Sequence, residues 1–140
     1  MIKLDYCSYE SAKYAVKHWH YSKTLPVGKM VRIGVWEDNK FIGCILYSRG
    51  ACYRLLEPYG LKQNQGCELT RIALANHKTP VTRIVRISIK LLKKACPGMK
   101  LIVSFADSRQ GHTGQIYKAG NWTYTGKVHS TPEYKINYRS

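Results

Sequence analysis

Apolar residues recur at helical spacing in two stretches of the chain. In the first, Ser8–His20, the apolar positions fall on one face and Ser8 is a suitable N-cap. In the second, Thr79 is the predicted N-cap, Pro80 takes the first helical position, and Pro97–Gly98 ends the helix. Its apolar stripe consists of Val81, Ile84, Val85, Leu91, Leu92 and Ala95. The pattern therefore predicts two amphipathic helices.

Runs rich in β-branched and aromatic residues predict strands between and after these helices. Met30–Trp36 and Phe41–Tyr47 flank the tight-turn sequence Glu37–Lys40, which is typical of an antiparallel hairpin. Further strands are predicted at Cys67–Ala75, Leu101–Ala106, Trp122–Val128 and Tyr134–Tyr138. Short helical segments are predicted at Ala51–Leu61 and Gly111–Ala119.

The order of these elements is helix, hairpin, strand, helix, strand, helix, strand. A strand–helix–strand unit implies parallel strands, whereas the hairpin is antiparallel. We therefore expect an α/β fold in which helices flank a mixed, mostly antiparallel central sheet in three layers. Residues 1–140 contain no linker or repeat, which predicts a single domain.

The charge of the chain is unusual for a domain of this size. Lys and Arg number 23 against 8 acidic residues, giving a formal net charge of +15. Because like charges repel, this imbalance points to a polyanionic partner such as DNA, the alternative being a basic surface kept for solubility. The five cysteines form no CxxC pair, and no stretch reaches membrane-spanning length, so we expect a soluble protein of a reducing compartment.

Three features of the second half are candidates for chemistry. The helix that begins near Thr79 presents free N–H groups that favour a phosphate, with Thr82 and Arg83 beside them, although every capped helix has such an end. Asp107 follows a strand at the edge where α/β sheets bind ligands, or it caps the turn that follows. Tyr117 precedes a glycine cap and an aromatic strand, or it is a packed aromatic residue.

This arrangement resembles the back half of the GCN5-related N-acyltransferases, the GNAT fold. In that family a tyrosine at the position of Tyr117 protonates the departing thiolate of coenzyme A, and the pyrophosphate rests on the preceding helix N-terminus. The glycine-containing loop of the family is replaced here by Asn76–Pro80. The resemblance implies an acetyl-CoA or related acyl-CoA cofactor, held without these glycines near Ile72, Leu74, Thr82 and Arg83.

A closer resemblance spans about Cys67 to Lys127 and is to the phage Mom family. The strings that carry it are Glu68–Leu74, Thr82–Arg86, Ser104–Asp107, Gln110–His112 and Ile116–Trp122, with a weaker match at His20–Ser22. It implies an enzyme of the host cytoplasm that converts adenine in phage DNA to N6-carbamoylmethyladenine and so protects it from restriction. It also implies functional roles for His20, Arg71, Asp107 and Tyr117.

The implied chemistry sets requirements for the site. The N6 amine of adenine is a poor nucleophile and is stacked in duplex DNA, so the base must be flipped into a pocket with aromatic walls. Asp107 or His20 would accept the amine proton, Tyr117 would donate one, and Arg71 would orient the substrate or Asp107. The residues predicted to contact double-stranded DNA are Tyr21, Tyr47, Arg49, Arg54, Arg86 and Lys90.

The carbamoylmethyl group is attached through its methylene carbon, which acetyl transfer alone does not produce. Iron is therefore a further candidate cofactor, with His20 and Asp107 as candidate ligands. Two other functions stay open. The protein is an acyl-CoA N-acyltransferase for a small amine or a protein, which leaves the charge unexplained, or a non-enzymatic DNA-binding protein, which leaves Asp107 and Tyr117 without a role. The sequence does not indicate an oligomeric state.

Overall fold

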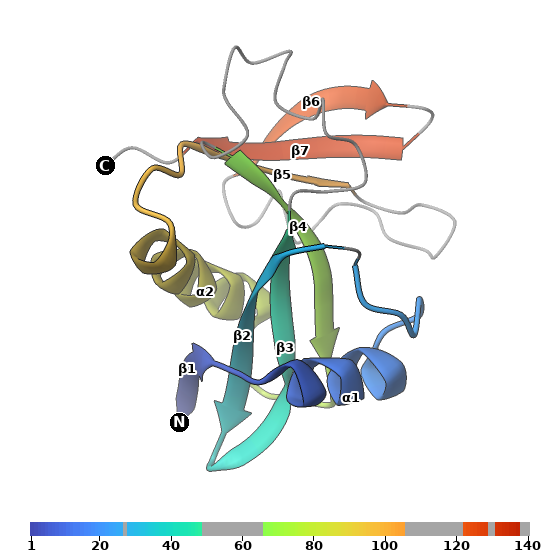
Figure 1. Cartoon of the computed structure of the whole chain (residues 1–140), viewed down its shortest axis with the longest axis vertical. Helices are drawn as coiled ribbons and strands as arrows, with labels where there is room; N and C mark the ends of the chain where they lie inside the picture. The colour runs from blue at the N-terminus through green and yellow to red at the C-terminus, as the bar shows by residue number, and fades with distance from the viewer. Residues whose placement is uncertain (27, 49–65, 106–121, 129–130, 138–140) are drawn as a thin grey trace.

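A computed structural model of the chain describes residues 1–26, 28–48, 66–105, 122–128 and 131–137 (Figure 1). Within these residues, seven strands form one sheet in the order β1-β2-β3-β4-β5-β7-β6, in which β4 and β5 are parallel and the other neighbours antiparallel. The strands are β1 (Ile2–Tyr6), β2 (Met30–Glu37), β3 (Lys40–Ser48), β4 (Gly66–Leu74), β5 (Leu101–Phe105), β6 (Thr123–Val128) and β7 (Thr131–Asn137). The helices are α1 (Tyr9–Trp19) and α2 (Val81–Ala95). The predicted α/β fold is thereby confirmed.

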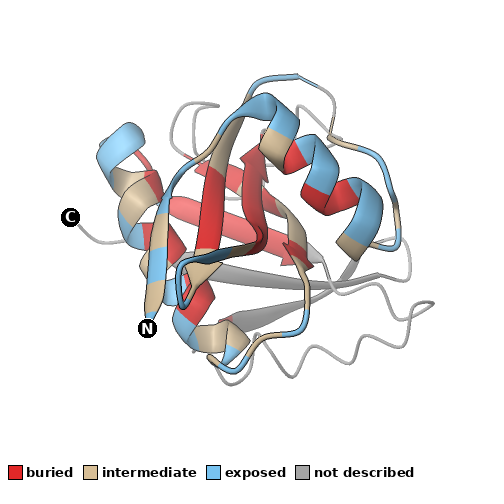
Figure 2. Cartoon of the chain, turned by 90° about the horizontal axis from the view of Figure 1, so that it is seen from below, coloured by how far each residue is buried: buried red, intermediate tan, exposed pale blue. Residues whose placement is uncertain are grey.

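The two helices cover opposite faces of the sheet. On β3, Ile45 and Tyr47 pack into a core with α2, whereas Cys44 and Leu46 pack into a smaller core with α1. This alternation is what a strand buried on both faces requires. Figure 2 shows the buried residues gathered on the central strands and on the inner sides of both helices. Three layers result, as the sequence predicts.

The first helix and the hairpin form for the predicted reasons. The Ser8 side chain accepts a hydrogen bond from the backbone N–H of Ser11, which caps α1. Asp38 and Asn39 have positive φ angles of 51° and 68°, the conformation that a two-residue hairpin turn requires. The hairpin therefore closes between Glu37 and Lys40, which are paired across β2 and β3.

The structure contains one strand that the sequence analysis did not predict. β1 pairs antiparallel with β2 at the edge of the sheet, with Leu4 opposite Val35. Ile2 and Leu4, both partly buried, pack against the α2-side core and alternate with Lys3 and Asp5. Five residues with two apolar positions are a weak signal in isolation, and the strand is stabilised by its neighbour in the sheet.

The predicted start of the second helix is wrong by one residue. Pro80, and not Thr79, is the N-cap residue of α2, and no side chain caps the helix. The Thr79 hydroxyl instead donates a hydrogen bond of 2.7 Å to the Glu37 carboxylate, which lies 42 positions earlier in the chain. A tertiary partner has therefore replaced the local cap that the sequence favours.

Candidate active site

Two of the residues with predicted catalytic roles are joined by one hydrogen-bond network. Nδ1 of His20, directly after α1, lies 2.8 Å from the Ser22 hydroxyl, which lies 3.2 Å from the Thr24 carbonyl oxygen. Nε of Arg71 on β4 donates to the same carbonyl oxygen at 3.1 Å. The structure thus brings together His20 and Arg71, which are far apart in the sequence, through the segment that follows α1.

Ser22 contacts the His20 ring through its backbone as well as through its side chain. The backbone N–H of Ser22 donates to Nδ1 of His20 at 3.1 Å. Nδ1 of His20 therefore has both the backbone N–H and the hydroxyl of Ser22 as partners, which orients the ring.

A bulge in β4 directs Arg71 toward α1. The register between β3 and β4 shifts, so that Leu46 is opposite Arg71 but Tyr47 is opposite Leu69. Leu69 and Ile72 consequently both pack on the α2 side although they are three positions apart, while Ala73 packs on the α1 side. The side chain of Arg71 lies on the same side of the sheet as Ala73, because regular alternation resumes after the extra residue. Its Nη1 donates to the Thr70 carbonyl oxygen at 2.9 Å.

The guanidinium of Arg71 has backbone partners in this arrangement. Among the residues that the structure describes, no carboxylate forms an ion pair with it. Two of its five N–H donors bind the carbonyl oxygens of Thr24 and Thr70, which fixes the plane of the group. A guanidinium held in this way is suited to bind an anionic or carbonyl oxygen.

Aromatic rings surround the end of α1. The rings of His20 and Tyr21 stack at 4.4 Å with an interplanar angle of 29°, and Tyr21 is 49% exposed. On the helix itself, Tyr14 contacts the rings of His18 at 4.3 Å and Trp19 at 5.4 Å. This position of Tyr21, beside His20 and on the surface, agrees with a role against a base, which stays a prediction.

β4 and β5 pair over only a short distance. Among the described residues, their parallel register joins Gly66–Glu68 to Leu101–Val103, while β4 continues to Leu74 alongside β3. The carboxyl half of β4, which contains Ile72 and Leu74, therefore runs beyond the pairing with β5 (Figure 1). Both side chains are partly buried and pack against the α2-side core.

The N-terminus of α2 follows this half of β4. Its first turn contains Thr82, partly buried, and Arg83, exposed, with no acidic residue and no capping side chain. The backbone N–H groups of Arg83 and Ile84 both bind the Pro80 carbonyl oxygen. Such an end favours an anion through its remaining N–H groups and the helix dipole.

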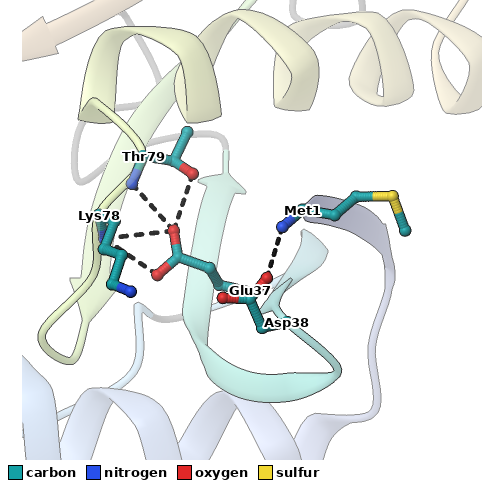
Figure 3. A network of polar contacts seen from close by, with 5 residues as sticks. All are labelled: Met1, Glu37, Asp38, Lys78 and Thr79. Carbon is teal, nitrogen blue, oxygen red and sulfur yellow. Dashed lines mark hydrogen bonds and ion pairs between the residues drawn. The ribbon is translucent and has the colours of Figure 1, made fainter.

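The loop between β4 and α2 is held by a carboxylate from the hairpin (Figure 3). Glu37 accepts hydrogen bonds from the backbone N–H groups of Lys78 and Thr79, each at 2.9 Å, and from the Thr79 hydroxyl. These hydrogen bonds lower the pKa of Glu37 from 4.5 to about 2. The bond from the N–H of Lys78 has the largest effect, followed by the bonds from the hydroxyl and the N–H of Thr79. Beside it in Figure 3, the Met1 amino group lies against Asp38.

We expect Glu37→Gln to destabilise the protein at neutral pH and much less in acid. A carboxylate whose pKa is lowered from 4.5 to about 2 contributes stability that is fully present above pH 4.5 and is lost as the pH falls through 2. The measurement is the urea midpoint of wild type and variant between pH 7 and pH 2. Thr79→Val, which removes one of the donors, should give a smaller loss over the same window. A wild-type advantage that stays constant down to pH 2 would contradict this role of Glu37.

The residues predicted to contact DNA do not share one face. Arg86 and Lys90 are exposed on the outer side of α2, across the sheet from His20 and Arg71. Tyr47 does not lie on a DNA-facing surface, contrary to the prediction. Its side chain is 1% exposed in the α2-side core, where its hydroxyl lies 2.7 Å from that of Ser88. It borders an apolar cavity of about 420 Å³ near the C-terminal end of α2.

Several predicted positions fall outside the described residues. These are Asp107, Tyr117, Arg49 and Arg54, together with the short helices predicted at Ala51–Leu61 and Gly111–Ala119. Among the described residues no group of three His, Cys, Asp or Glu side chains is placed to hold a metal ion. Neither described helix has the length and apolar character needed to cross a bilayer.

The sequence analysis missed three residues that position this site. Ser22 and Thr24 link His20 to Arg71, and Glu37 holds the loop before α2. Ser22 appears in the string His20–Ser22 but carries no distinct signal of its own. Glu37 belongs to a turn sequence, and its partners become evident only when β2 and β4 lie in one sheet.

Comparisons with known proteins show a sequence relative and a shared fold. In Escherichia phage Mu, the methylcarbamoylase mom is 25% identical over 128 residues, covering 86% of this chain and 52% of the relative. The chain thus spans about half the length of that relative. The N-acetyltransferase PseH of Campylobacter jejuni, solved with acetyl coenzyme A, superposes with a TM-score of 0.65 at 13% identity over 99% of this chain and 100% of that one.

A second solved structure extends the likeness. The PaiA N-acetyltransferase of Thermoplasma acidophilum, solved with coenzyme A, has a TM-score of 0.60 at 16% identity and covers 99% of both chains. These likenesses show the GNAT acetyltransferase fold that the sequence analysis expected. The model of the Mom protein family matches residues 1–139. The chain therefore belongs to the Mom protein family.

Proposed function

We propose that this protein modifies adenine in DNA, with an acyl-CoA as cofactor and N6-carbamoylmethyladenine as product. The observation that carries the proposal is the family match over residues 1–139. The phage Mu relative is named a methylcarbamoylase, which agrees with such a product. The net charge of +15 supports a polyanionic substrate. The alternative, an N-acyltransferase for a small amine, does not account for this charge.

The residues present fit an acyl-CoA. The first turn of α2 has N–H groups without a capping side chain, and Thr82 and Arg83 add a hydroxyl and a positive charge for phosphate groups. Beside it, the part of β4 with Ile72 and Leu74 extends beyond the pairing with β5. The Glu37 carboxylate occupies the N–H groups of the preceding loop, so the helix end is the anion-binding part. The cofactor would supply an acyl group activated as a thioester.

The side chains of the network would act on the base. The His20 ring would lie beside the base, and Arg71 would stabilise negative charge that develops on the acyl oxygen. Asp107 is the proposed acceptor of the N6 proton, because Nδ1 of His20 is engaged by Ser22. Tyr117 is the proposed proton donor to the leaving group. Tyr21, stacked on His20, is the proposed aromatic contact of the flipped base.

Iron does not fit the described part of this site. Nδ1 of His20 is engaged by the hydroxyl and N–H of Ser22, and the second candidate ligand, Asp107, lies outside the described residues. The described residues also offer no group of three metal-ligating side chains. Two further reagents are needed to reach the product from an acetyl thioester. The bond between N6 and the methylene carbon requires a two-electron oxidation of the methyl carbon, and the terminal amide requires a nitrogen source that displaces the thiol of coenzyme A. In the proposal the oxidant and the nitrogen source are separate co-substrates.

The proposed function is tested by two binding measurements on the purified protein. Isothermal titration calorimetry should show that it binds acetyl-CoA, and fluorescence anisotropy should show that it binds duplex DNA with an affinity that falls steeply with salt. Acetyl-CoA binding without DNA affinity would favour the small-amine acyltransferase and overturn the proposal. DNA binding without acetyl-CoA affinity would favour a non-enzymatic DNA-binding protein.

A further inference from the structure

The outer face of α1 combines exposed aromatic rings with positive charge. Tyr14 is 53% exposed and lies 4.3 Å, ring to ring, from the exposed His18. Lys13 and Lys17 are exposed beside them, and Glu10 is the acidic residue of the helix, one turn earlier. We call Lys13, Tyr14, Lys17 and His18 together the α1 face. No predicted DNA contact lies on these four residues.

The α1 face leads directly to the network around Arg71. Trp19 closes α1, and its ring meets that of Tyr14 edge to face at 5.4 Å. His20 and Tyr21 come next, stacked at 4.4 Å, and the chain then reaches the carbonyl of Thr24 that Arg71 binds. Aromatic rings thus continue from the exposed helix surface into the segment that carries the proposed chemistry.

We propose that the α1 face is the surface on which DNA docks, with the lysines on the phosphates and the Tyr14 and His18 rings against an unpaired base. This inference rests on the proposed function and adds the location of the substrate. Lysines flanking exposed rings match the combination that binds single-stranded or flipped bases, where every base offers a π-face. A protein partner is disfavoured, because the cores of protein interfaces are depleted of lysine.

A second basic surface lies on the other face of the sheet. The outer side of α2 carries the exposed row Arg83, Arg86, Lys90 and Lys94, which lies across the sheet from α1. This row has charge but lies on the face opposite His20 and Arg71. DNA seated on the α1 face places a flipped base beside the network, whereas DNA seated on α2 places it on the other side of the sheet.

The test compares two double variants that each remove two positive charges from exposed helix positions. Lys13→Gln with Lys17→Gln changes the α1 face, and Arg86→Gln with Lys90→Gln is the matched control on α2. Binding of a fluorescent duplex with one unpaired adenine is measured by anisotropy from low to moderate salt. The α1 variant should reduce the slope of log affinity against log salt by about 1.8, two contacts at roughly 0.9 each, and the α2 control should reduce it less.

Aromatic stacking is tested separately from charge. Tyr14→Ala should weaken binding of the same duplex roughly 5- to 150-fold, while Tyr14→Phe keeps the ring and should bind like wild type. Tyr9→Ala is the control, because Tyr9 is a 47% exposed tyrosine of the same helix that lies about 140° around it from Tyr14. Circular dichroism melting of each variant verifies that the fold is retained.

The outcomes distinguish this inference from the proposed function. If the wild type binds DNA but the α2 control loses as much salt dependence as the α1 variant, or more, the docking surface is wrong and the proposed function stands. If Tyr14→Ala binds like Tyr9→Ala, the stacking role is wrong. If the wild-type protein binds no DNA, both the inference and the proposed function fail.

Discussion

Arg71→Ala is expected to lower the rate of adenine modification about 10²- to 10³-fold, the usual effect of removing one donor that stabilises developing charge. Arg71 holds its guanidinium plane through the carbonyl oxygens of Thr24 and Thr70. Arg71→Lys keeps the charge but cannot reproduce two directed N–H bonds from one planar group, so it should recover only part of the rate. The measurement is the initial rate of modified deoxyadenosine formation on a defined duplex.

Arg32 provides a matched control for this prediction. Its Nε donates to the Cys7 carbonyl oxygen at 3.2 Å, so it is also a partly buried arginine bound to a backbone carbonyl. It does not belong to the network around His20. Arg32→Ala should therefore leave the modification rate near that of wild type. Equal losses in the Arg71 and Arg32 variants, accompanied by equal drops in melting temperature, would show that Arg71 has only a structural role.

Gly43→Ala is expected to destabilise the fold by about 4 kcal/mol, because a strained φ and an overpacked backbone contact each cost roughly 1 to 3 kcal/mol. Gly43 has a φ of +149°, and a Cβ there would lie 1.9 Å from the Ala73 carbonyl oxygen. That oxygen belongs to the backbone of β4 and cannot move without separating β3 from β4. Thermal melting followed by circular dichroism should show a midpoint lower by roughly 10 °C or more.

Gly28→Ala separates the two causes of that loss. Gly28 also has a positive φ, of +90°, but a Cβ there would meet no atom within 4 Å. The substitution therefore carries conformational strain without a clash, and it should cost only about 1 kcal/mol. If Gly43→Ala and Gly28→Ala destabilise the protein equally, the close approach of β3 and β4 does not restrict this position.

The elements with strong local signals could be predicted from the sequence. α1 and α2 follow from apolar residues at helical spacing, and the β2–β3 hairpin follows from a turn whose Asp38 and Asn39 adopt the required positive φ. β1 was missed because Ile2 and Leu4 give only one period of alternation. Its stability comes from pairing with β2, which a five-residue pattern does not reveal.

Long-range partners account for the predictions that were wrong. Thr79 has the chemistry of an N-cap, but Glu37 lies close enough to take its hydroxyl. Tyr47 has the chemistry of a base-stacking residue, but it lies on a strand covered by a helix on each face. In both cases the prediction followed from the residue type and its local sequence. The residue instead contacts parts of the fold that are distant in the sequence.

The site itself was predictable only in part. His20 and Arg71 could be named from the family resemblance, yet their connection depends on Ser22, Thr24 and the bulge in β4. A bulge adds one residue to a strand without changing the apolar composition, so alternation alone does not show on which face Arg71 lies. The roles of Asp107 and Tyr117 stay predictions from the sequence.

The central claim is that the chain modifies adenine in DNA, and mass spectrometry of nucleosides tests it most directly. Plasmid DNA is isolated from cells that produce the wild type, Asp107→Asn or Tyr117→Phe, and is digested to nucleosides. The account predicts a deoxyadenosine carrying a carbamoylmethyl group in the wild-type sample, with strong loss in both variants. Unmodified deoxyadenosine in the wild-type sample, with the protein folded and abundant, would contradict it.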